Sequence, residues 1–418
     1  MSDHDALLAA ICAEPDDDTP RLVFADWLEE NDQVDRAAFV RAQVELARTP
    51  PWEPFAAFCR WRRPEWSSGK PFRDTLPPLA GSAVEWHPQA FRRGLPWRLN
   101  VRSLVAWEKV APGVLERAPV GEVQFWGADT LDQWHEFAAT PLVSRLRVVH
   151  LMTRPVEPLI VLRDAPAALG IEDVHFERAT GAGIAFVVQD LLASPLGRTV
   201  RGLHFHMGYE SLDDLIEELE RAHRLERLSL ALMGLTEHHV RRMCDGPLVG
   251  TLSELSLRGN PLGSAGVHVF AASLTTPSLH TLDLSGTGTA GFGLEALTST
   301  PGAVGLRRLD LSCNPLSPRA ARLLSRSPHL AGLRSVNLSK SRVGERELFH
   351  LTRAKFWGNL AELDLRDNPL SRPGVRHLLD AAVPDDLAAL VLTGDQLGAE
   401  SRRELRNKYG ERVVFATG

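Results

Sequence analysis

Residues 252–266 read LSELSLRGNPLGSAG, and residues 360–374 read LAELDLRDNPLSRPG. Both follow the pattern L-x-x-L-x-L-x-x-N-x-L-x-x-x-G. The leucine part recurs down the second half of the chain, and its middle apolar residue falls at positions 228, 255, 282, 309, 336, 363 and 390, a constant step of 27 residues. A constant step of this length indicates stacked structural repeats.

Looser copies extend the series toward the N-terminus. Their middle apolar residues are Val123, Val149, Val174 and Leu203, at steps of 25 to 29 residues. The series therefore predicts about eleven repeats over residues 119–418. The apolar stretch 413–415 is expected to add a last, partial strand.

The second half of each repeat has helical spacing. Val267, Phe270 and Leu274 lie three and four residues apart, which places them on one face of a helix, and similar stripes follow in the next repeats. Each repeat is therefore predicted to be a short strand, a turn and a helix. One such unit cannot bury its apolar face alone, so neighbouring units must stack to close a core.

A polar position follows the leucines in each of these repeats. Asparagine alternates there with a shorter or acidic side chain, so that Asn260, Asn314 and Asn368 alternate with Thr287, Ser341 and Asp395. An asparagine side chain can hydrogen-bond the backbone of the turn that leaves the strand. The alternation predicts two slightly different turns in succession.

These motifs resemble the leucine-rich repeat proteins of the ribonuclease-inhibitor-like subfamily, over about residues 119–418. The resemblance implies an α/β fold, a right-handed leucine-rich repeat solenoid (horseshoe) with parallel strands inside and helices outside. It does not assign a function, because this scaffold serves inhibitors, GTPase activators, sensors and adaptors.

Residues 1–49 are expected to form a small all-α module of three helices. They hold twelve acidic residues against four arginines. Thr19 and Pro20 suit the start of the second helix. The sequences RLVFADWLEE (21–30) and RAAFVRAQ (36–43) resemble the bacterial repeat-companion module, for which no biochemical activity is implied.

Residues 50–118 are rich in tryptophan and arginine. Six of the ten tryptophans lie here, with eleven basic residues against six acidic ones. We expect a connector and N-terminal cap that covers the first repeat strand, onto which the acidic module could fold back. An acidic protein partner and nucleic acid remain as alternatives, the latter through Arg60, Arg62, Arg63, Arg92 and Arg93.

The repeat register predicts which side chains line the concave face. In L-x-x-L-x-L the residue between the last two apolar positions points away from the core, because strand side chains alternate. This first column reads Gln124, His150, His175, His204, Ser229, Ser256, Asp283, Asp310, Asn337, Asp364 and Val391. The second column, two residues on, reads Trp126, Met152, Glu177, His206, Ala231, Arg258, Ser285, Ser312, Ser339, Arg366 and Thr393.

These columns supply the candidate partner-binding residues, because aromatic, methionine, histidine and arginine side chains are typical interface anchors. The candidates are Trp126, His150, Met152, His175, Glu177, His204, His206, Arg258 and Arg366. The four histidines are also candidate ligands for zinc or another divalent ion, and a metal-dependent hydrolytic site is an alternative function. If they titrate near their ordinary pKa of ~6.5, they should repel one another below about pH 6.

Other functional classes find little support in the sequence. The net charge of −6 argues against nucleic acid and anionic membranes as the main partner, and no apolar run reaches the ~18 residues of a membrane-spanning helix. The acidic start and four scattered cysteines suggest a cytoplasmic protein with reduced thiols. The common catalytic motifs are missing. The sequence thus predicts a non-catalytic, cofactor-free protein-binding scaffold, with regulation of a partner enzyme such as a small GTPase as a further alternative.

Overall fold

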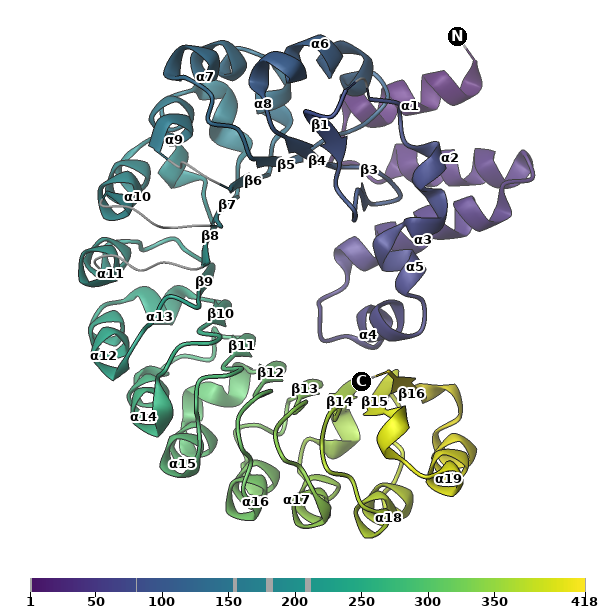
Figure 1. Ribbon diagram of the computed structural model, residues 1–418, viewed down its shortest axis with the longest axis vertical. Coiled ribbons are helices and arrows are strands. Elements are labelled where there is room, and N and C mark those ends of the chain that lie inside the picture. The colour runs from purple at the N-terminus through teal and green to yellow at the C-terminus, as the bar shows by residue number, and fades with distance from the viewer. Residues whose placement is uncertain (1, 80, 153–155, 178–182, 207–211, 418) are drawn as a thin grey trace. The chain divides into compact units, whose positions relative to one another are not determined.

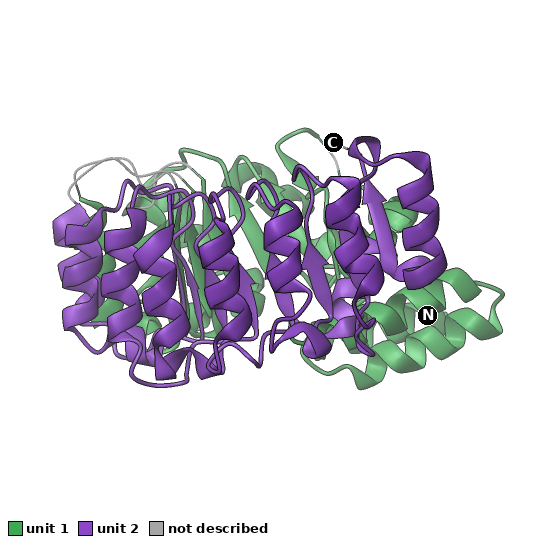
Figure 2. Ribbon diagram, turned by 90° about the horizontal axis from the view of Figure 1, so that it is seen from below, with its two compact units in different colours: residues 1–50, 63–205 green, residues 51–62, 206–418 purple. Residues whose placement is uncertain are grey.

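The computed structural model describes residues 2–79, 81–152, 156–177, 183–206 and 212–417. The chain divides into two compact units (Figure 2). Unit 1 comprises Met1–Pro50 and Arg63–Phe205, and unit 2 comprises Pro51–Arg62 and His206–Gly418. Both units contain short parallel strands, each followed by a helix (Figure 1).

Unit 1 begins with three helices, as predicted. They are α1 (Asp3–Ala13), α2 (Thr19–Glu30) and α3 (Val34–Arg48). Ser2 caps α1 in a capping box with Asp5, and Pro20 occupies the first turn of α2. Their shared core includes Phe24, Leu28 and Val40, and Leu95 packs into it from the following segment.

The acidic module contacts the basic part of its own unit, as its charge suggested. Arg93 donates to the backbone oxygen of Asp16 at 2.9 Å and lies 3.6 Å from a carboxylate oxygen of Asp18. Arg147 pairs with the Asp16 carboxylate at 2.8 Å. The opposite charges predicted from composition therefore meet within unit 1.

The remaining elements of unit 1 alternate strands with helices. They are α5 (Pro64–Ser68), η1 (Lys70–Thr75), β1 (Val84–Trp86), β2 (Phe91–Arg92), β3 (Leu95–Pro96), β4 (Arg98–Val101), α6 (Leu104–Leu115), β5 (Glu122–Phe125), α7 (Leu131–Ala138), α8 (Pro141–Arg145), β6 (Val148–Leu151), α9 (Val156–Leu162), η2 (Pro166–Gly170), β7 (Asp173–Phe176), α10 (Ile184–Ala193), η3 (Leu196–Arg198) and β8 (Gly202–His206).

The first strands of unit 1 show how the repeat array begins. Strand β1 pairs antiparallel with β4, and β4 pairs parallel with β5. Because β4 is followed by α6, a strand–helix unit precedes the first repeat that the sequence predicted. Trp86, Trp97 and Trp107 are buried here, so these tryptophans contribute to the packing of the first strands.

Unit 2 continues the same alternation. Its elements are α4 (Pro54–Trp61), α11 (Leu212–Glu220), β9 (Arg227–Ala231), α12 (Glu237–Asp245), α13 (Leu248–Thr251), β10 (Glu254–Ser256), α14 (Gly263–Ser273), β11 (Thr281–Asp283), α15 (Gly291–Ser299), η4 (Pro301–Gly305), β12 (Arg308–Asp310), α16 (Pro318–Arg326), β13 (Ser335–Asn337), α17 (Glu345–Leu351), η5 (Trp357–Asn359), β14 (Glu362–Asp364), α18 (Arg372–Asp380), β15 (Ala389–Thr393), η6 (Gly394–Gln396), α19 (Ala399–Tyr409), η7 (Gly410–Arg412) and β16 (Val413–Ala416).

The strand register agrees with the predicted columns. In unit 2, Leu255 pairs with Leu282, Leu282 with Leu309, and Asp283 with Asp310, so residues 27 apart lie side by side. The leucines are buried between sheet and helices, and the first-column residues lie on the opposite side, which we call the inner face. The predicted last strand forms as β16, parallel to β15.

The asparagine side chains hydrogen-bond the backbone of the turns, as predicted, and they also connect neighbouring repeats. The Asn314 side-chain oxygen accepts from the Thr289 N–H at 2.9 Å, and its amide donates to the backbone oxygens of Leu284 and Leu311 at 2.8 and 3.1 Å. Thr287, at the intervening position, donates to the Leu284 oxygen at 2.7 Å. The asparagine repeats therefore make more bonds to their neighbours than this threonine does.

Among the helices formed by the described residues, none combines the length and the apolar composition that crossing a bilayer requires.

Candidate functional site

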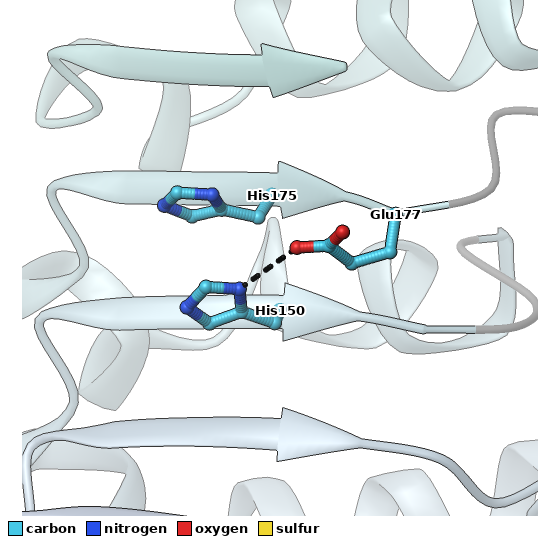
Figure 3. A group of neighbouring side chains, drawn as sticks. All are labelled: His150, His175 and Glu177. Atoms are coloured by element: carbon cyan, nitrogen blue, oxygen red, sulfur yellow. Dashed lines mark hydrogen bonds and ion pairs between the residues drawn. The ribbon is translucent and has the colours of Figure 1, made fainter. Parts of the chain in front are cut away.

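Three histidines form a stack on the inner face of unit 1. The register pairs Gln124 with His150, His150 with His175, and His175 with His204, so the predicted first column is continuous across β5 to β8. The ring centroids of His150 and His175 lie 4.0 Å apart at 18°, and those of His175 and His204 lie 4.0 Å apart at 9°. Figure 3 shows the first two rings, from neighbouring strands, one above the other.

Carboxylates hold the first ring of the stack on both sides. His150 is 7% exposed, with Nε2 2.8 Å from an oxygen of Glu122 and Nδ1 3.3 Å from an oxygen of Glu177 (Figure 3). Arg98 pairs with the same Glu122 carboxylate at 2.7 Å. Burial disfavours the charged ring, but the hydrogen bonds to Glu122 and Glu177 outweigh it and raise the pKa of His150.

Glu122 is the buried carboxylate that pairs with Nε2 of His150. Burial disfavours its charged form, but the hydrogen bond from His150 and the charge of Arg98 prevail, and its pKa is lowered. The carboxylates of Glu122 and Glu177 thus favour the charged form of the His150 ring, and Arg98 and His150 favour the charged form of Glu122.

The pKa of His175, the middle ring of the stack, is lowered rather than raised. Burial, followed by the like charges of His204 and His150, lowers the pKa of His175 to about 2. The expectation that all these histidines titrate near 6.5 is therefore wrong for His175, which stays neutral at physiological pH. His204 places Nε2 3.1 Å from a carboxylate oxygen of Asp173.

The second column runs beside the stack. The backbone N–H groups of Trp126, Met152 and Glu177 continue the strand ladders, with bonds of 2.8, 3.0 and 3.2 Å to the preceding strands. The Trp126 side chain is 41% exposed, whereas Met152 and Glu177 are half-buried. An exposed indole and a thioether thus lie one column away from the imidazole stack.

The other three predicted residues belong to unit 2. His206 is the last residue of β8, whose other residues belong to unit 1, and it is half-buried; Arg258 is exposed after β10. Arg366 is engaged within its own unit: its Nε donates to the Asp364 carboxylate at 3.1 Å, and its guanidinium lies 4.7 Å from the Trp61 ring centre. The structure brings His150, His175, His204 and Glu177 together but assigns Arg366 to an internal contact.

Metal binding by the histidines depends on their orientation. Ligand atoms of His150, His175 and Glu177 all lie within 4.8 Å of one another, whereas His204 and His206 are not part of this cluster of described residues. An imidazole binds a metal in its ring plane at ~2.0–2.1 Å. Because the two rings are stacked, one of them must rotate before both can bind a single ion.

Several residues of the site escaped the sequence analysis. Glu122 and Asp173 begin strands β5 and β7, two residues before the first column, and therefore share the inner face. Glu362 occupies the same position in β14 and accepts from the Trp61 indole N–H at 2.5 Å. Reading the column before the middle leucine would have found all three carboxylates.

The parallel strands at a constant step, the buried leucines and the asparagine side chains that bridge adjacent repeats define a leucine-rich repeat fold. No family model matches the chain, and no curated protein matches it. Among solved structures, an internalin (InlF) from Listeria monocytogenes aligns with a TM-score of 0.40 and 13% identity, over 69% of this chain and 70% of that chain. A complex of TLR13 with the single-stranded RNA ssRNA13 aligns with a TM-score of 0.35 and 14% identity, over 69% of this chain and 38% of that one.

Proposed function

We propose that this chain is a non-catalytic scaffold that binds a protein partner on the inner face of unit 1. The observation that carries the proposal is the exposed indole of Trp126 beside Met152 and the imidazole stack. Large aromatic and methionine side chains on a rigid surface are typical anchors of protein interfaces. In the same proposal the array is of the ribonuclease-inhibitor-like type, its acidic helices are a repeat-companion module, and the protein is cytoplasmic.

The electrostatics of the stack support binding over catalysis. A general base works best with a pKa near the operating pH. The pKa of His175 is about 2, and both nitrogens of His150 face carboxylates. The His175 ring is therefore not set up to exchange protons with a substrate near neutral pH, whereas ordered polar groups next to an exposed indole suit recognition.

The test is affinity capture from the native cell extract with quantitative mass spectrometry. Trp126→Ala, Met152→Ala and His204→Ala together should lower the captured amount of a specific partner at least tenfold. The matched control is Phe186→Ala with Phe292→Ala, which removes two exposed aromatic rings from helices α10 and α15. If the triple variant captures the partner as well as the wild type does and its thermal unfolding is unchanged, the proposed site is wrong.

A second candidate function is metal binding at His150, His175 and Glu177, favoured by the closeness of their ligand atoms. Two histidines and one carboxylate suit zinc or another divalent transition metal. Calorimetric titration with Zn²⁺ should show one ion per chain, and His175→Ala should abolish the binding. The absence of heat with the wild type, together with no metal in the purified protein, would exclude this function.

A further inference from the structure

Residues 51–62 belong to unit 2, although the chain on both sides of them belongs to unit 1 (Figure 2). Pro54 opens the helix of this segment, α4, because proline suits the first turn of a helix. The helix packs against β15, on the inner side of the strands in Figure 1. A short segment of the chain thus covers part of the inner face of unit 2.

A buried carboxylate is the centre of this contact. Glu362 is 5% exposed, accepts from the Trp61 indole N–H at 2.5 Å and from the Ser335 hydroxyl at 2.9 Å, and pairs with Arg60. Burial disfavours its charged form, but the charge of Arg60 and the indole hydrogen bond outweigh it, so its pKa is lowered. The Glu362 carboxylate therefore binds the adjacent Arg60 and Trp61 side chains together.

The Trp61 ring is held on a second side by a cation. The Arg366 guanidinium lies 4.7 Å from the ring centre, and Asp364 fixes that guanidinium through Nε and Nη2 at 3.1 and 2.8 Å. A cation over the face of an indole is attracted by the ring's quadrupole, so this contact stabilises the position of Trp61. The indole thus has a hydrogen-bond acceptor and a stacking partner on unit 2.

The strand under α4 is adapted to a covering helix. Val391 stands opposite Asp364 in the register and Ala389 opposite Glu362, and each interrupts a column that is polar in the preceding repeats of unit 2. Both residues are buried, and so are Ala56 and Ala57 on α4. Small and apolar side chains on the two elements allow the helix and the strand to approach closely.

The ends of the segment add contacts that extend its footprint. Trp52 stacks on His280 with ring centres 5.7 Å apart, and Glu53 pairs with Arg334 at 3.0 Å. Arg62 pairs with Glu411, just before β16. The segment therefore spans the repeats from β11 to β16 and forms ion pairs with oppositely charged side chains at several points.

The large side chains of residues 51–62 are less buried than those of a hydrophobic core, as is typical of a bound ligand. Its large side chains, Trp52, Phe55, Phe58 and Trp61, are all half-buried. In contrast, Phe24 in the N-terminal helices is fully buried. Half-buried rings contribute less than fully buried ones do, which is the energetic condition for an occupant that can be exchanged.

We propose that the inner face of unit 2 around Glu362 is a peptide-docking site and that residues 51–62 are its built-in occupant. The partner that fits it is a short helical segment of another protein that carries an arginine–tryptophan pair, small residues on the face toward β15, and a following cation for Glu411. This site lies in unit 2 and is separate from the binding face proposed in unit 1.

The covalent connection of residues 51–62 to the rest of the chain determines how strongly they compete with a partner segment for the site. Because residues 51–62 are part of the same chain, they act at an effective concentration on the order of millimolar. A partner segment of equal intrinsic affinity therefore binds the wild type weakly. Weakening the built-in contacts should expose the site to the partner segment without any change at the site itself.

The experiment uses a fluorescein-labelled peptide with the sequence of residues 51–62, in which Cys59→Ser prevents oxidation. Fluorescence anisotropy measures its binding to the full chain. The peptide should bind the Arg60→Ala/Trp61→Ala variant at least tenfold more tightly than the wild type. Adding Glu362→Gln to that variant should weaken binding at least tenfold, because the paired acceptor is lost.

The matched control peptide carries the Arg60→Ala and Trp61→Ala changes and should not bind any of the proteins. Circular dichroism confirms that each variant is folded. No binding to the folded Arg60→Ala/Trp61→Ala variant, or equal binding with and without Glu362→Gln, overturns the proposal.

A second measurement needs no variant. With millimolar peptide added to the wild type, hydrogen exchange of residues 51–62 should accelerate at least threefold while that of β13 and β14 stays unchanged. Unchanged exchange of residues 51–62 in saturating peptide contradicts a displaceable occupant.

Discussion

At the scale of single residues, the asparagines and the histidines show how one side chain acts on its neighbours in adjacent repeats. Asn314 is almost fully buried, and its amide bonds the backbone of its own turn and of the preceding repeat. His175 lies between two rings and is kept neutral by them and by burial. Both effects depend on the strand register, which places residues 27 or so apart in contact.

Asn314→Ala should lower the free energy of unfolding of its region by about 2–3 kcal/mol, because buried backbone groups of two repeats lose their partners. Thr287→Ala, which removes a hydroxyl that donates to the Leu284 oxygen, should cost about 1 kcal/mol. Urea denaturation followed by circular dichroism measures both. If Asn314→Ala lowers the free energy of unfolding no more than Thr287→Ala does, the role given to the asparagine hydrogen bonds is wrong.

His175 should make the protein less stable in acid. Its folded pKa of about 2 lies below the unfolded value of ~6.5, so the unfolded chain binds the proton more readily. Stability should therefore fall as the pH drops below about 6.5, by up to about 2 kcal/mol between pH 7 and pH 5. His175→Phe keeps a ring in the stack and removes this loss. Urea midpoints of both proteins at the two pH values test it, and an equal acid loss in both would falsify the assignment.

At the scale of secondary-structure elements, the β2–β3 hairpin explains how the N-terminal helices attach to unit 1. Arg93 and Gly94 form its turn with φ of +51° and +80°. A Cβ on Gly94 would lie 2.6 Å from the Cα of Val40 in α3. The turn therefore requires glycine both for its conformation and for the close approach of the helix.

Gly94→Ala should lower the stability of the helical module by at least about 2 kcal/mol, since backbone must move to admit the methyl group. Gly113→Ala, inside α6 with no atom within 4 Å of the added carbon, serves as the control and should be neutral or stabilising by up to about 1 kcal/mol. Limited proteolysis should cut the 1–50 region faster in Gly94→Ala than in the control. Equal cleavage of the two variants removes the role given to this hairpin.

The same scale shows where sequence reading succeeds and where it ends. The helices at the N-terminus, the strand register and the first column were predicted correctly, because they follow from local spacing. The strand β4 was not assigned to a repeat, because Leu99 and Val101 follow tryptophan- and proline-rich sequence that hides the motif. The stacking of the three rings and their distances to the carboxylates around them are set by the tertiary structure, and no spacing in the sequence indicates them.

At the scale of the whole molecule, repeats contact mainly their neighbours in sequence, so the effect of a substitution should stay local. In Asn314→Ala, hydrogen exchange should accelerate in the repeats around β11 to β13, with little change in α1 to α3. Exchange measured by mass spectrometry resolves these regions. Equal acceleration throughout the chain would mean that the described units unfold as one cooperative body.

The constant step of 27 residues by itself determined the repeat architecture, because periodic leucines can be buried only when identical units stack. It also determined which side chains share a face. The position of residues 51–62 was decided only by the tertiary structure: Trp61 and Glu362 are 301 residues apart, and no local pattern links them. The ionisation of the imidazole stack was decided there too, since it depends on burial and on distances between charges that spacing alone does not set.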